Sequence, residues 1–258
     1  MSRTKKYSVL TYNIGKYELF YDLSPNVMND EIEYIYVTDD HSIMSDTWNI
    51  VYEDNLVGDV FDKVYQIKFN PFKYIHTDVV LTIDARIEIL KDVMPMFEMF
   101  DKYGYDAAVV PHFLFGDINS EYDNWVNNRN YPIEEKEKCI NFIKSLGYDL
   151  NYKGLYEGGI SIKRNNSFCK SWCAMTYGFL KFLATPPSTI ERNDQVICSV
   201  VLNKYFNDKN IMPISPYIYA RHDADDTYFK LHIRGDYGYC FALSEYPLYL
   251  FNKLIIFS

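Results

Sequence analysis

The feature that most constrains the fold is an apolar run from Val79 to Ile83 that ends in a carboxylate, Asp84. Most of this run is apolar and favours β structure, which is typical of a parallel strand buried on both faces. In open α/β sheets the ligand crevice lies beyond the carboxyl ends of the strands. An acid at that position is placed to meet a substrate or a metal ion. The alternative is that Asp84 caps the turn that follows the strand.

Strands and helices alternate on both sides of this run. Hydrophobic spacing predicts strands at residues 7–12, 31–37, 48–52, 79–84, 107–110 and 154–162, and helices at 56–69, 90–103, 132–146, 168–183 and 190–206. This alternation indicates an α/β domain with a mostly parallel central sheet and flanking helices. Residues 113–131 are rich in Asn, Asp and aromatic side chains without a clear period, so we expect a long loop that acts as a lid.

The chain is predicted to form one main domain at residues 1–210 and a C-terminal extension at 211–258 that packs on the same domain. From about Ile211 onwards the pattern changes to short extended pieces. The apolar tail at 246–258 is too short to span a bilayer. We expect it to be a packed terminal element, with peripheral membrane contact as the alternative.

The net charge and the N-terminal residues predict which partners the protein binds and where in the cell it lies. The formal net charge of −9 and the pI near 5.1 argue against nucleic acid or an anionic membrane surface as the main partner. Both would require clustered Lys and Arg to offset phosphate. The first six residues lead into a strand without the long apolar region of a signal peptide, which predicts a cytoplasmic location.

Acidic residues follow two of the predicted strands, with Asp39 and Asp40 after the second and Asp84 after the central one. Mn²⁺ and Mg²⁺ prefer oxygen ligands, and one or two carboxylates with phosphate oxygens and waters complete their coordination. Arg86 offers a bidentate partner for phosphate on the same edge of the sheet. Gly15, after the first strand, permits close approach of the backbone to a ligand. These features together suit a nucleotide-diphosphate sugar.

Six short motifs occur in order along residues 7–206. They are Tyr-Asn-Ile-Gly-Lys-Tyr at 12–17, Tyr-Val-Thr-Asp-Asp at 36–40, Lys-Phe-Asn-Pro at 68–71, Thr-Ile-Asp-Ala-Arg-Ile-Glu-Ile at 82–89, Tyr-Glu-Gly-Gly-Ile at 156–160 and Glu-Arg-Asn-Asp-Gln at 191–195. With these motifs the chain resembles the GT-A glycosyltransferases. Among them it looks most like the glycosyltransferase-like family of bacterial surface-polysaccharide loci and plant cell-wall proteins, which is related to retaining family 8 type enzymes.

The resemblance implies a GT-A-type, Rossmann-like fold and transfer of a sugar from a nucleotide-diphosphate donor to a hydroxyl of a glycan or other acceptor, with a UDP-sugar as the expected donor. It assigns nucleotide binding to Tyr12, Asn13, Gly15, Asp39, Asp40 and Lys68. It assigns catalytic roles to Asp84, Asp194 and Gln195, and substrate binding to Glu157, Gly158 and Gly159. Arg86 is a further catalytic candidate as the phosphate partner, and His112, after the strand at 107–110, is a further candidate for substrate binding.

The chain departs from the family at the Asp-x-Asp metal motif, which reads Asp84-Ala85-Arg86 and lacks its second carboxylate. One hypothesis is that His222 or His232 completes an Mn²⁺ or Mg²⁺ site with Asp84. The other is that Arg86 and Lys68 neutralise the diphosphate without a metal ion.

Each assignment has a structural alternative. Asp194 can be an acid that stabilises the first turn of a helix, and Glu157 can be a turn residue. Lone histidines are more often surface or hydrogen-bonded residues than ligands. The broken metal motif also allows a non-catalytic carbohydrate-binding or assembly protein with a degenerate site. A nucleotidyltransferase ranks lower, because only Gly15 and Lys16 stand where a phosphate-binding loop would be.

Overall fold

The computed structural model describes residues 5–112, 115–129, 131–184, 193–214, 219–220 and 228–232. Within them a seven-stranded sheet forms the centre of an α/β domain, in the order β3-β2-β1-β4-β7-β6-β8. Its strands are β1 (Tyr7–Asn13), β2 (Ile32–Thr38), β3 (Asn49–Tyr52), β4 (Val79–Ile83), β6 (Ala107–Pro111), β7 (Tyr156–Arg164) and β8 (Ile211–Pro213). All neighbouring pairs are parallel except those of β7, which runs antiparallel to β4 and β6. The predicted fold class, α/β with a mostly parallel sheet, is confirmed.

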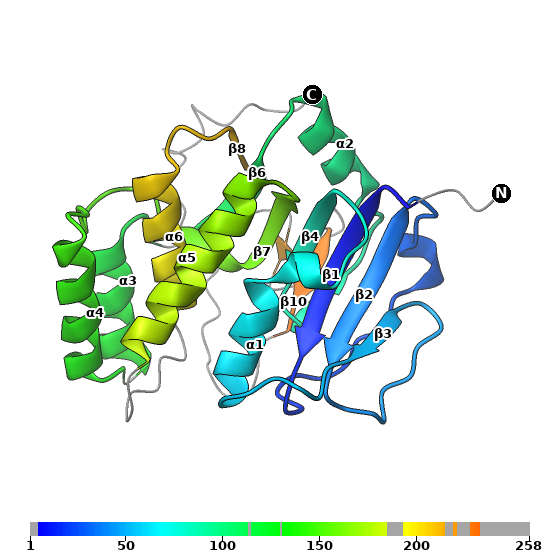
Figure 1. Ribbon diagram of the computed structural model, residues 1–258, viewed down its shortest axis with the longest axis horizontal. Helices are drawn as coiled ribbons and strands as arrows, with labels where there is room; N and C mark the ends of the chain where they lie inside the picture. Colours follow the sequence, from blue (N-terminus) through cyan, green and yellow to red (C-terminus); the bar gives the residue numbers. More distant parts are fainter. Residues whose placement is uncertain are drawn as a thin grey trace.

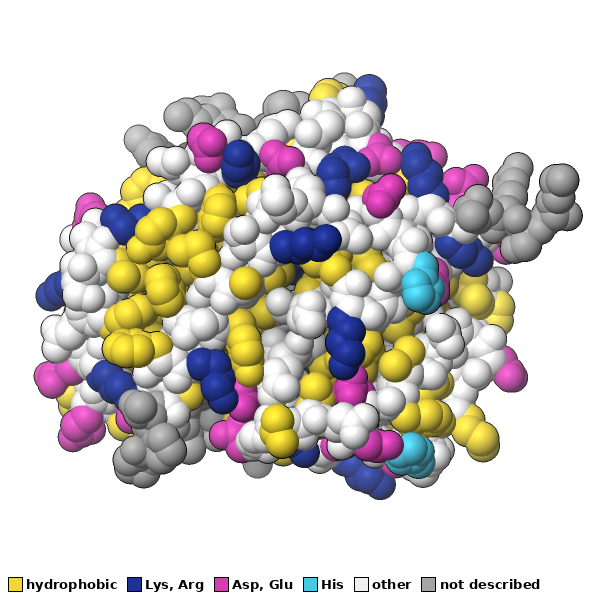
Figure 2. Space-filling view, in the orientation of Figure 1, with side chains coloured by type: hydrophobic (Ala, Val, Ile, Leu, Met, Phe, Trp, Pro, Cys, Tyr) yellow, Lys and Arg dark blue, Asp and Glu magenta, His cyan; other side chains and the backbone are white. Residues whose placement is uncertain are grey.

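Helices cover the sheet on both faces (Figure 1). They are α1 (Val60–Lys68), α2 (Met94–Lys102), α3 (Ile118–Arg129), α4 (Ile133–Ser145), α5 (Ser167–Leu183) and α6 (Asp194–Tyr205), with short 3-10 turns η1 (Pro25–Val27) and η2 (Pro71–Lys73). Hydrophobic side chains gather over α4 and α5 on the face shown in Figure 2, where Phe142 contacts Phe179 and Phe182 at ring-centroid distances of 5.2 and 5.4 Å.

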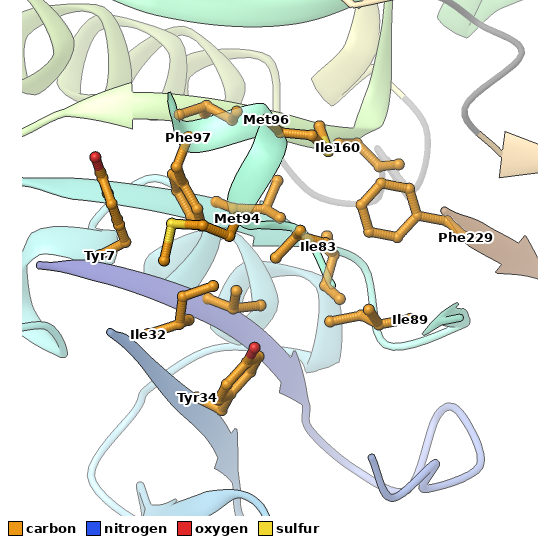
Figure 3. Packing of buried hydrophobic residues seen from close by; sticks show 14 of the residues in the cluster. Tyr7, Ile32, Tyr34, Ile83, Ile89, Met94, Met96, Phe97, Ile160 and Phe229 are labelled. Carbon is orange, nitrogen blue, oxygen red and sulfur yellow. The ribbon is translucent and has the colours of Figure 1, made fainter. Parts of the chain in front are cut away.

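Alternate residues of the strands enter two different cores. In β4, Leu81 and Ile83 face a cluster that includes Phe97 of α2, whereas Val80 faces a cluster that includes Ile67 of α1. Figure 3 shows the first cluster, in which Met94 and Phe97 lie over the sheet and Phe229 lies at the opposite end from Tyr7. The sheet is therefore buried on both faces, as the continuous apolar run at Val79 to Ile83 predicts.

Strand order reverses between β1 and β4. From β1 the chain moves outward through β2 and β3, and it then returns to pair β4 with the other side of β1. This is the 3-2-1-4 arrangement of doubly wound sheets, in which the ligand crevice opens at the reversal, beyond the carboxyl ends of the strands. The fold thus directs attention to the residues that follow β1 and β4.

The prediction of a loop at 113–131 is wrong, because α3 occupies most of that segment. Ile118, Tyr122 and Trp125 recur at helical spacing and are all buried, and Tyr122 and Trp125 meet edge-to-face at 5.2 Å. The many polar residues between them hid this period. A helix packed through three large side chains is part of the core, so this stretch does not form the expected loop.

Several boundaries also differ from the prediction. Helix α1 starts at Val60, four residues later than expected, because Asp59 caps it by accepting from the Asp62 N–H at 2.8 Å. A second, small sheet in the order β5-β10-β9 was not expected. It joins β5 (Ile87–Ile89), directly after the central strand, to β9 (Tyr219–Ala220) and β10 (Phe229–Leu231).

The described parts of the predicted C-terminal extension pack on the main domain. Strand β8 is the outermost strand of the central sheet beside β6, and β10 pairs antiparallel with β5. The apolar tail at 246–258 lies outside the described residues, as do residues 190–192 of the predicted helix at 190–206. Among the described helices, none is long and apolar enough to cross a membrane.

Candidate functional site at the carboxyl edge of the sheet

The predicted site residues gather along one edge of the central sheet. Asn13 ends β1, Asp84 follows β4 and His112 follows β6, so all three lie at carboxyl ends of parallel strands. Strand β7 is antiparallel and therefore begins at this edge with Glu157, Gly158 and Gly159.

A backbone hydrogen bond joins β4 to β7 at this edge: the Asp84 N–H donates to the Gly159 carbonyl at 2.9 Å. The edge is also irregular there. Pairing of β6 with β7 shifts from Val109–Ser161 to Val110–Glu157, so residues 158–160 have no register partner in β6, although Ile160 still pairs with Ile83 of β4. Bulges of this kind occur next to active sites, where they re-aim side chains.

A charged cluster lies at the reversal of strand order. Lys68 Nζ lies 2.7 Å from Asp194 Oδ2 and 3.3 Å from Asp84 Oδ1. The Tyr12 hydroxyl donates to the same Asp84 oxygen at 2.7 Å. Side-chain exposures are only 11% for Lys68, 23% for Asp84 and 15% for Asp194. Four predicted residues from β1, α1, the end of β4 and α6 thus meet in one largely buried ionic cluster.

The cluster keeps its charges. Burial opposes the charged form of Lys68, but Asp194 and Asp84 outweigh that effect and hold the pKa of the ammonium well above its usual value. Burial likewise opposes ionisation of Asp84, yet Lys68, Arg86 and the Tyr12 hydroxyl keep the pKa of its carboxyl below its usual value. Burial and the nearby Asp84 charge raise the pKa of Tyr12, so its hydroxyl stays protonated and remains a donor. The site therefore presents a charged Lys68 ammonium beside an ionised Asp84 at neutral pH, with Asp194 Oδ2 2.7 Å from the same ammonium.

Helix α6 carries Asp194 and Gln195 in its first turn, and a buried hydrogen-bond pair fixes that turn. Asn193, which is fully buried, accepts from the Tyr122 hydroxyl at 2.7 Å and donates to the Tyr131 hydroxyl at 2.9 Å. Tyr122 of α3 and Tyr131, two residues before α4, thus position the start of α6.

A second polar cluster lies further along the same edge. His112 Nε2 lies 3.5 Å from Glu157 Oε1 and 3.7 Å from Glu121 Oε1. Gln195 Nε2 donates to that oxygen of Glu121 at 3.3 Å. The Phe115 N–H donates to His112 Nδ1 at 2.9 Å, so the neutral imidazole carries its hydrogen on Nε2 and directs it at the carboxylates.

Gly158 joins the two clusters. Its N–H donates to Gln195 Oε1 at 3.4 Å. A Cβ atom at this position would lie 3.3 Å from Asp194 Oδ2 and 3.4 Å from Lys68 Nζ. The absence of a side chain at Gly158 therefore lets the charged residues close over the strand.

A hydrogen bond connects the turn after β1 to the residues after β2. Gly15 has a φ of 69°, and its N–H donates to Asp39 Oδ1 at 2.8 Å. Asn13 bonds to both backbone groups of Glu18, at 2.6 and 3.0 Å, and so closes the turn. Asp40 accepts from Ser42. Asn13, Asp39 and Asp40 thus shape this end of the crevice through the backbone.

Arg86 and His232 lie at the end of the small sheet, directly before β5 and directly after β10. Arg86 is exposed, and its carbonyl accepts from the His232 N–H at 2.9 Å. The His232 ring lies 2.9 Å from Glu88 Oε2 and stacks on Tyr21 at a centroid distance of 4.0 Å. The contacts of the His232 ring are thus with Glu88 and Tyr21, whereas His222 lies outside the described residues.

The described residues do not by themselves fit the expected Mn²⁺ or Mg²⁺. Across the described ranges, no group of three or more His, Cys, Asp or Glu side chains is arranged to hold a metal ion. Asp84 Oδ1 is already shared by Tyr12 and Lys68, and the motif position two residues later is a cation, Arg86. The chemistry described below therefore contains no step through a metal ion.

Two further features were not anticipated. Glu121 is nearly fully buried and contributes a carboxylate to the second cluster, but the segment was predicted to be a loop. The helical spacing of Ile118, Tyr122 and Trp125 was the signal that could have placed it on a helix. A hollow of about 520 Å³ lies between α1 and α5, and its lining, which includes Tyr65, Phe69, Phe72 and Lys170, contains no carboxylate.

Comparison with known proteins adds no identification. No protein-family model matches the chain, and no curated protein matches it. The arrangement of residues at the carboxyl edge is therefore the evidence that bears on function.

Proposed function

We propose that this protein is a glycosyltransferase of GT-A type, which moves a sugar from a nucleotide-diphosphate donor, most simply a UDP-sugar, to an acceptor hydroxyl. The observation that carries the proposal is the buried cluster of Tyr12, Lys68, Asp84 and Asp194 at the reversal of strand order. Ligands of doubly wound sheets bind at this point. Buried ionic groups gathered in such a crevice are candidates for a functional site.

The donor is proposed to lie across the ends of β1 and β4. Its nucleoside would meet the Gly15 turn with Asp39 and Asp40, and its diphosphate would meet the exposed guanidinium of Arg86 and the ammonium of Lys68. The acceptor hydroxyl oxygen attacks the anomeric carbon, and the bond from that carbon to the diphosphate oxygen breaks. The nucleoside diphosphate leaves with the electron pair, and its phosphate takes up the proton that the hydroxyl loses. The positive groups stabilise the charge that develops on the leaving phosphate.

The second cluster is proposed to face the sugar and the acceptor. His112, Glu157 and Gln195 supply donors and acceptors suited to hydroxyl groups, and Gly158 leaves the strand beneath them without a side chain. Only the resemblance suggests that the product belongs to the synthesis of a surface polysaccharide or another glycan. Chelation tests whether a metal ion or the Lys68 and Arg86 pair neutralises the diphosphate.

The test is release of nucleoside diphosphate from a panel of UDP-sugars, GDP-sugars and CMP-sugars, with wild type and Asp84→Ala compared. We expect at least one donor to be turned over, and we expect Asp84→Ala to lose about 100-fold or more of that rate. Glu137→Gln, an exposed change on α4, is the matched control and should keep the full rate. Full activity in folded Asp84→Ala would refute the proposed mechanism.

One observation favours a non-catalytic alternative. Asp84 stands in a metal motif without a second carboxylate, and its Oδ1 oxygen is engaged by Tyr12 and Lys68. A carbohydrate-binding or assembly protein with a degenerate site predicts binding of sugars without affinity for nucleotides. Titration with free glycans and with UDP separates the two functions.

A further inference from the structure

A second concave site lies away from the carboxyl edge. Helices α1 and α5 lie on the same face of the sheet (Figure 1) and, with the η2 turn, border a hollow of about 520 Å³. Pockets that hold small molecules have volumes of roughly 300–1,000 Å³. The described lining comes from within residues 56–74 and 170–177, and it includes no member of the charged cluster or of the His112 cluster. The hollow is therefore a candidate site of its own.

Aromatic rings form much of the wall of this hollow. Tyr65, Phe69 and Tyr74 are buried, whereas Phe72 and Tyr177 are half-buried. The negative face of an aromatic ring attracts the C–H groups on one side of a sugar ring. The wall thus includes two rings that a sugar could contact from solvent.

Two amide side chains in the lining suit hydroxyl groups. Gln66 Nε2 donates to the Val57 carbonyl at 2.6 Å, which fixes the side chain and leaves Oε1 as an acceptor. Asn70 is exposed, and its side chain forms no hydrogen bond with another residue that the structure describes. Because a sugar hydroxyl both donates and accepts, each amide has a role that it can take toward a sugar.

The charge at the hollow is positive. Lys73 and Lys170 belong to the lining, which contains no carboxylate among the described residues. Lys73 pairs with Glu53 outside the lining, whereas the exposed Lys170 holds its ammonium 5.8 Å from the centre of the Phe72 ring. Within the described ranges the Lys170 ammonium forms no ion pair with a carboxylate. Because the whole chain has a formal net charge of −9, this local excess of cations favours an anionic ligand.

We propose that the hollow between α1 and α5 binds a short acidic saccharide, whose sugar rings carry carboxylates. A ring of the saccharide lies against Phe72 and Tyr177, its hydroxyls meet the amides of Gln66 and Asn70, and its carboxylate meets the ammonium of Lys170. A neutral sugar would make the first two kinds of contact but not the third. This inference does not rest on the proposed function, because the described lining shares no residue with the two clusters of the carboxyl edge.

The test is isothermal titration of the full chain with trigalacturonate, a hyaluronan tetrasaccharide and an alginate trisaccharide. The methyl ester of the acid that binds most tightly is the matched probe, since it keeps the rings and removes the charges. We expect at least one acid to bind, its ester to bind roughly tenfold more weakly, and added salt to weaken the binding of the acid. Equal affinity for acid and ester would overturn the inference, as would the failure of all the acids to bind at millimolar concentrations.

Variants locate the site. Lys170→Gln should weaken binding of the acid roughly tenfold, and Ala174→Trp, which places a large side chain in the lining from the exposed side of α5, should abolish it. Lys144→Gln, an exposed change on α4, is the matched control and should bind the acid as wild type does. Wild-type affinity in either folded variant of the hollow would overturn the inference.

UDP separates this inference from the proposed function. The thermal stabilisation that UDP gives through the carboxyl edge should be the same in wild type, Lys170→Gln and Ala174→Trp, and UDP should not displace the bound acid. Displacement would place the saccharide at the carboxyl edge and overturn the inference. A chain that binds the acid at the hollow but no nucleotide would refute the proposed function and support the inference.

Discussion

Lys68 is the residue on which the geometry of the candidate site depends most. It is the last residue of α1, and its ammonium joins a carboxylate after β4 to one at the start of α6. Asp84 and Asp194 are separated by more than a hundred positions in the chain, and without the lysine two carboxylates would face each other in a largely buried place. Lys68 therefore has a structural role in addition to the proposed contact with the diphosphate.

Removal of the Lys68 charge should destabilise the fold at neutral pH. We expect Lys68→Met to lower the free energy of unfolding by about 3–5 kcal/mol, because it leaves two uncompensated carboxylates. The matched control is Lys181→Met, whose ammonium beside Asp62 is 51% exposed, against 11% for Lys68, and which should cost roughly 0–1 kcal/mol. Urea unfolding at pH 7 measures both variants. Equal losses for the two would show that the buried cluster has no special role.

The pH dependence of that difference follows from the direction of the Asp84 shift. In wild type the folded-state pKa of Asp84 is lowered, so its contribution to stability is present above the unfolded value and is lost as pH falls through the folded value. In Lys68→Met the carboxylates lose their cation and bind protons more readily. The difference between wild type and variant should therefore be largest near pH 7 and shrink at acidic pH.

At this scale the sequence singled out several residues that the structure brings together. Lys68, Asp84 and Asp194 all belong to short motifs that resemble a known family, and the structure brings them together. Glu121 belongs to no such motif, and its partner Gln195 is distant in sequence. A carboxylate that reaches a site only through the packing of α3 cannot be found from local pattern.

The elements that build the edge are β7 and α6. Antiparallel β7 brings its first residues to the carboxyl ends of β4 and β6, and α6 begins over the same place, with Gln195 bonded to the backbone of Gly158. Close approach of the helix to the strand requires glycine at that position. The two clusters of the site are therefore coupled through a single backbone position.

Gly158→Ala tests this arrangement. Its Cβ would lie 3.3 Å from Asp194 Oδ2 and must displace the charged residues by a few tenths of an ångström. We expect affinity for the donor to fall roughly tenfold or more, because small misplacements in a site have large effects. Gly178→Ala in α5 is the control, since no atom lies within 4 Å of its added methyl group, and it should stabilise the helix by about 1 kcal/mol without changing affinity. Isothermal titration with the donor and urea unfolding measure both, and unchanged affinity in Gly158→Ala would contradict the coupling.

The central strands followed from sequence more closely than α3 and β5 did. Buried strands such as β4 are continuous apolar runs whose ends are clear, whereas α3 has only three core side chains among polar residues. Strand β5 is three residues long and exists because β10 pairs with it. A short strand of that kind depends on a partner far away in the chain, and no local periodicity reports it.

At the scale of the whole molecule, the order 3-2-1-4 of the first four sheet strands places Tyr12 and Asp84 at the reversal, where doubly wound sheets bind their ligands. Most of the residues singled out from sequence lie along this one edge, from Asp39 after β2 to His112 after β6. A single ligand that spans the edge would contact both the charged cluster and the His112 cluster. The proposed nucleotide-diphosphate sugar carries both the charge and the hydroxyl groups that such contacts would use.

The most direct test of the central claim is the thermal stability of the purified chain with UDP, GDP, CMP and UDP-sugars, each with Mn²⁺ and with EDTA. A ligand that binds only the folded state at 100 times its Kd adds about 2.7 kcal/mol, which raises the Tm by several degrees. We predict stabilisation by a nucleotide diphosphate or its sugar that survives EDTA, with Lys68 and Arg86 as the cations. Stabilisation that requires Mn²⁺ would keep the transferase and assign the diphosphate to a metal ion. The absence of a shift with every nucleotide would contradict the account.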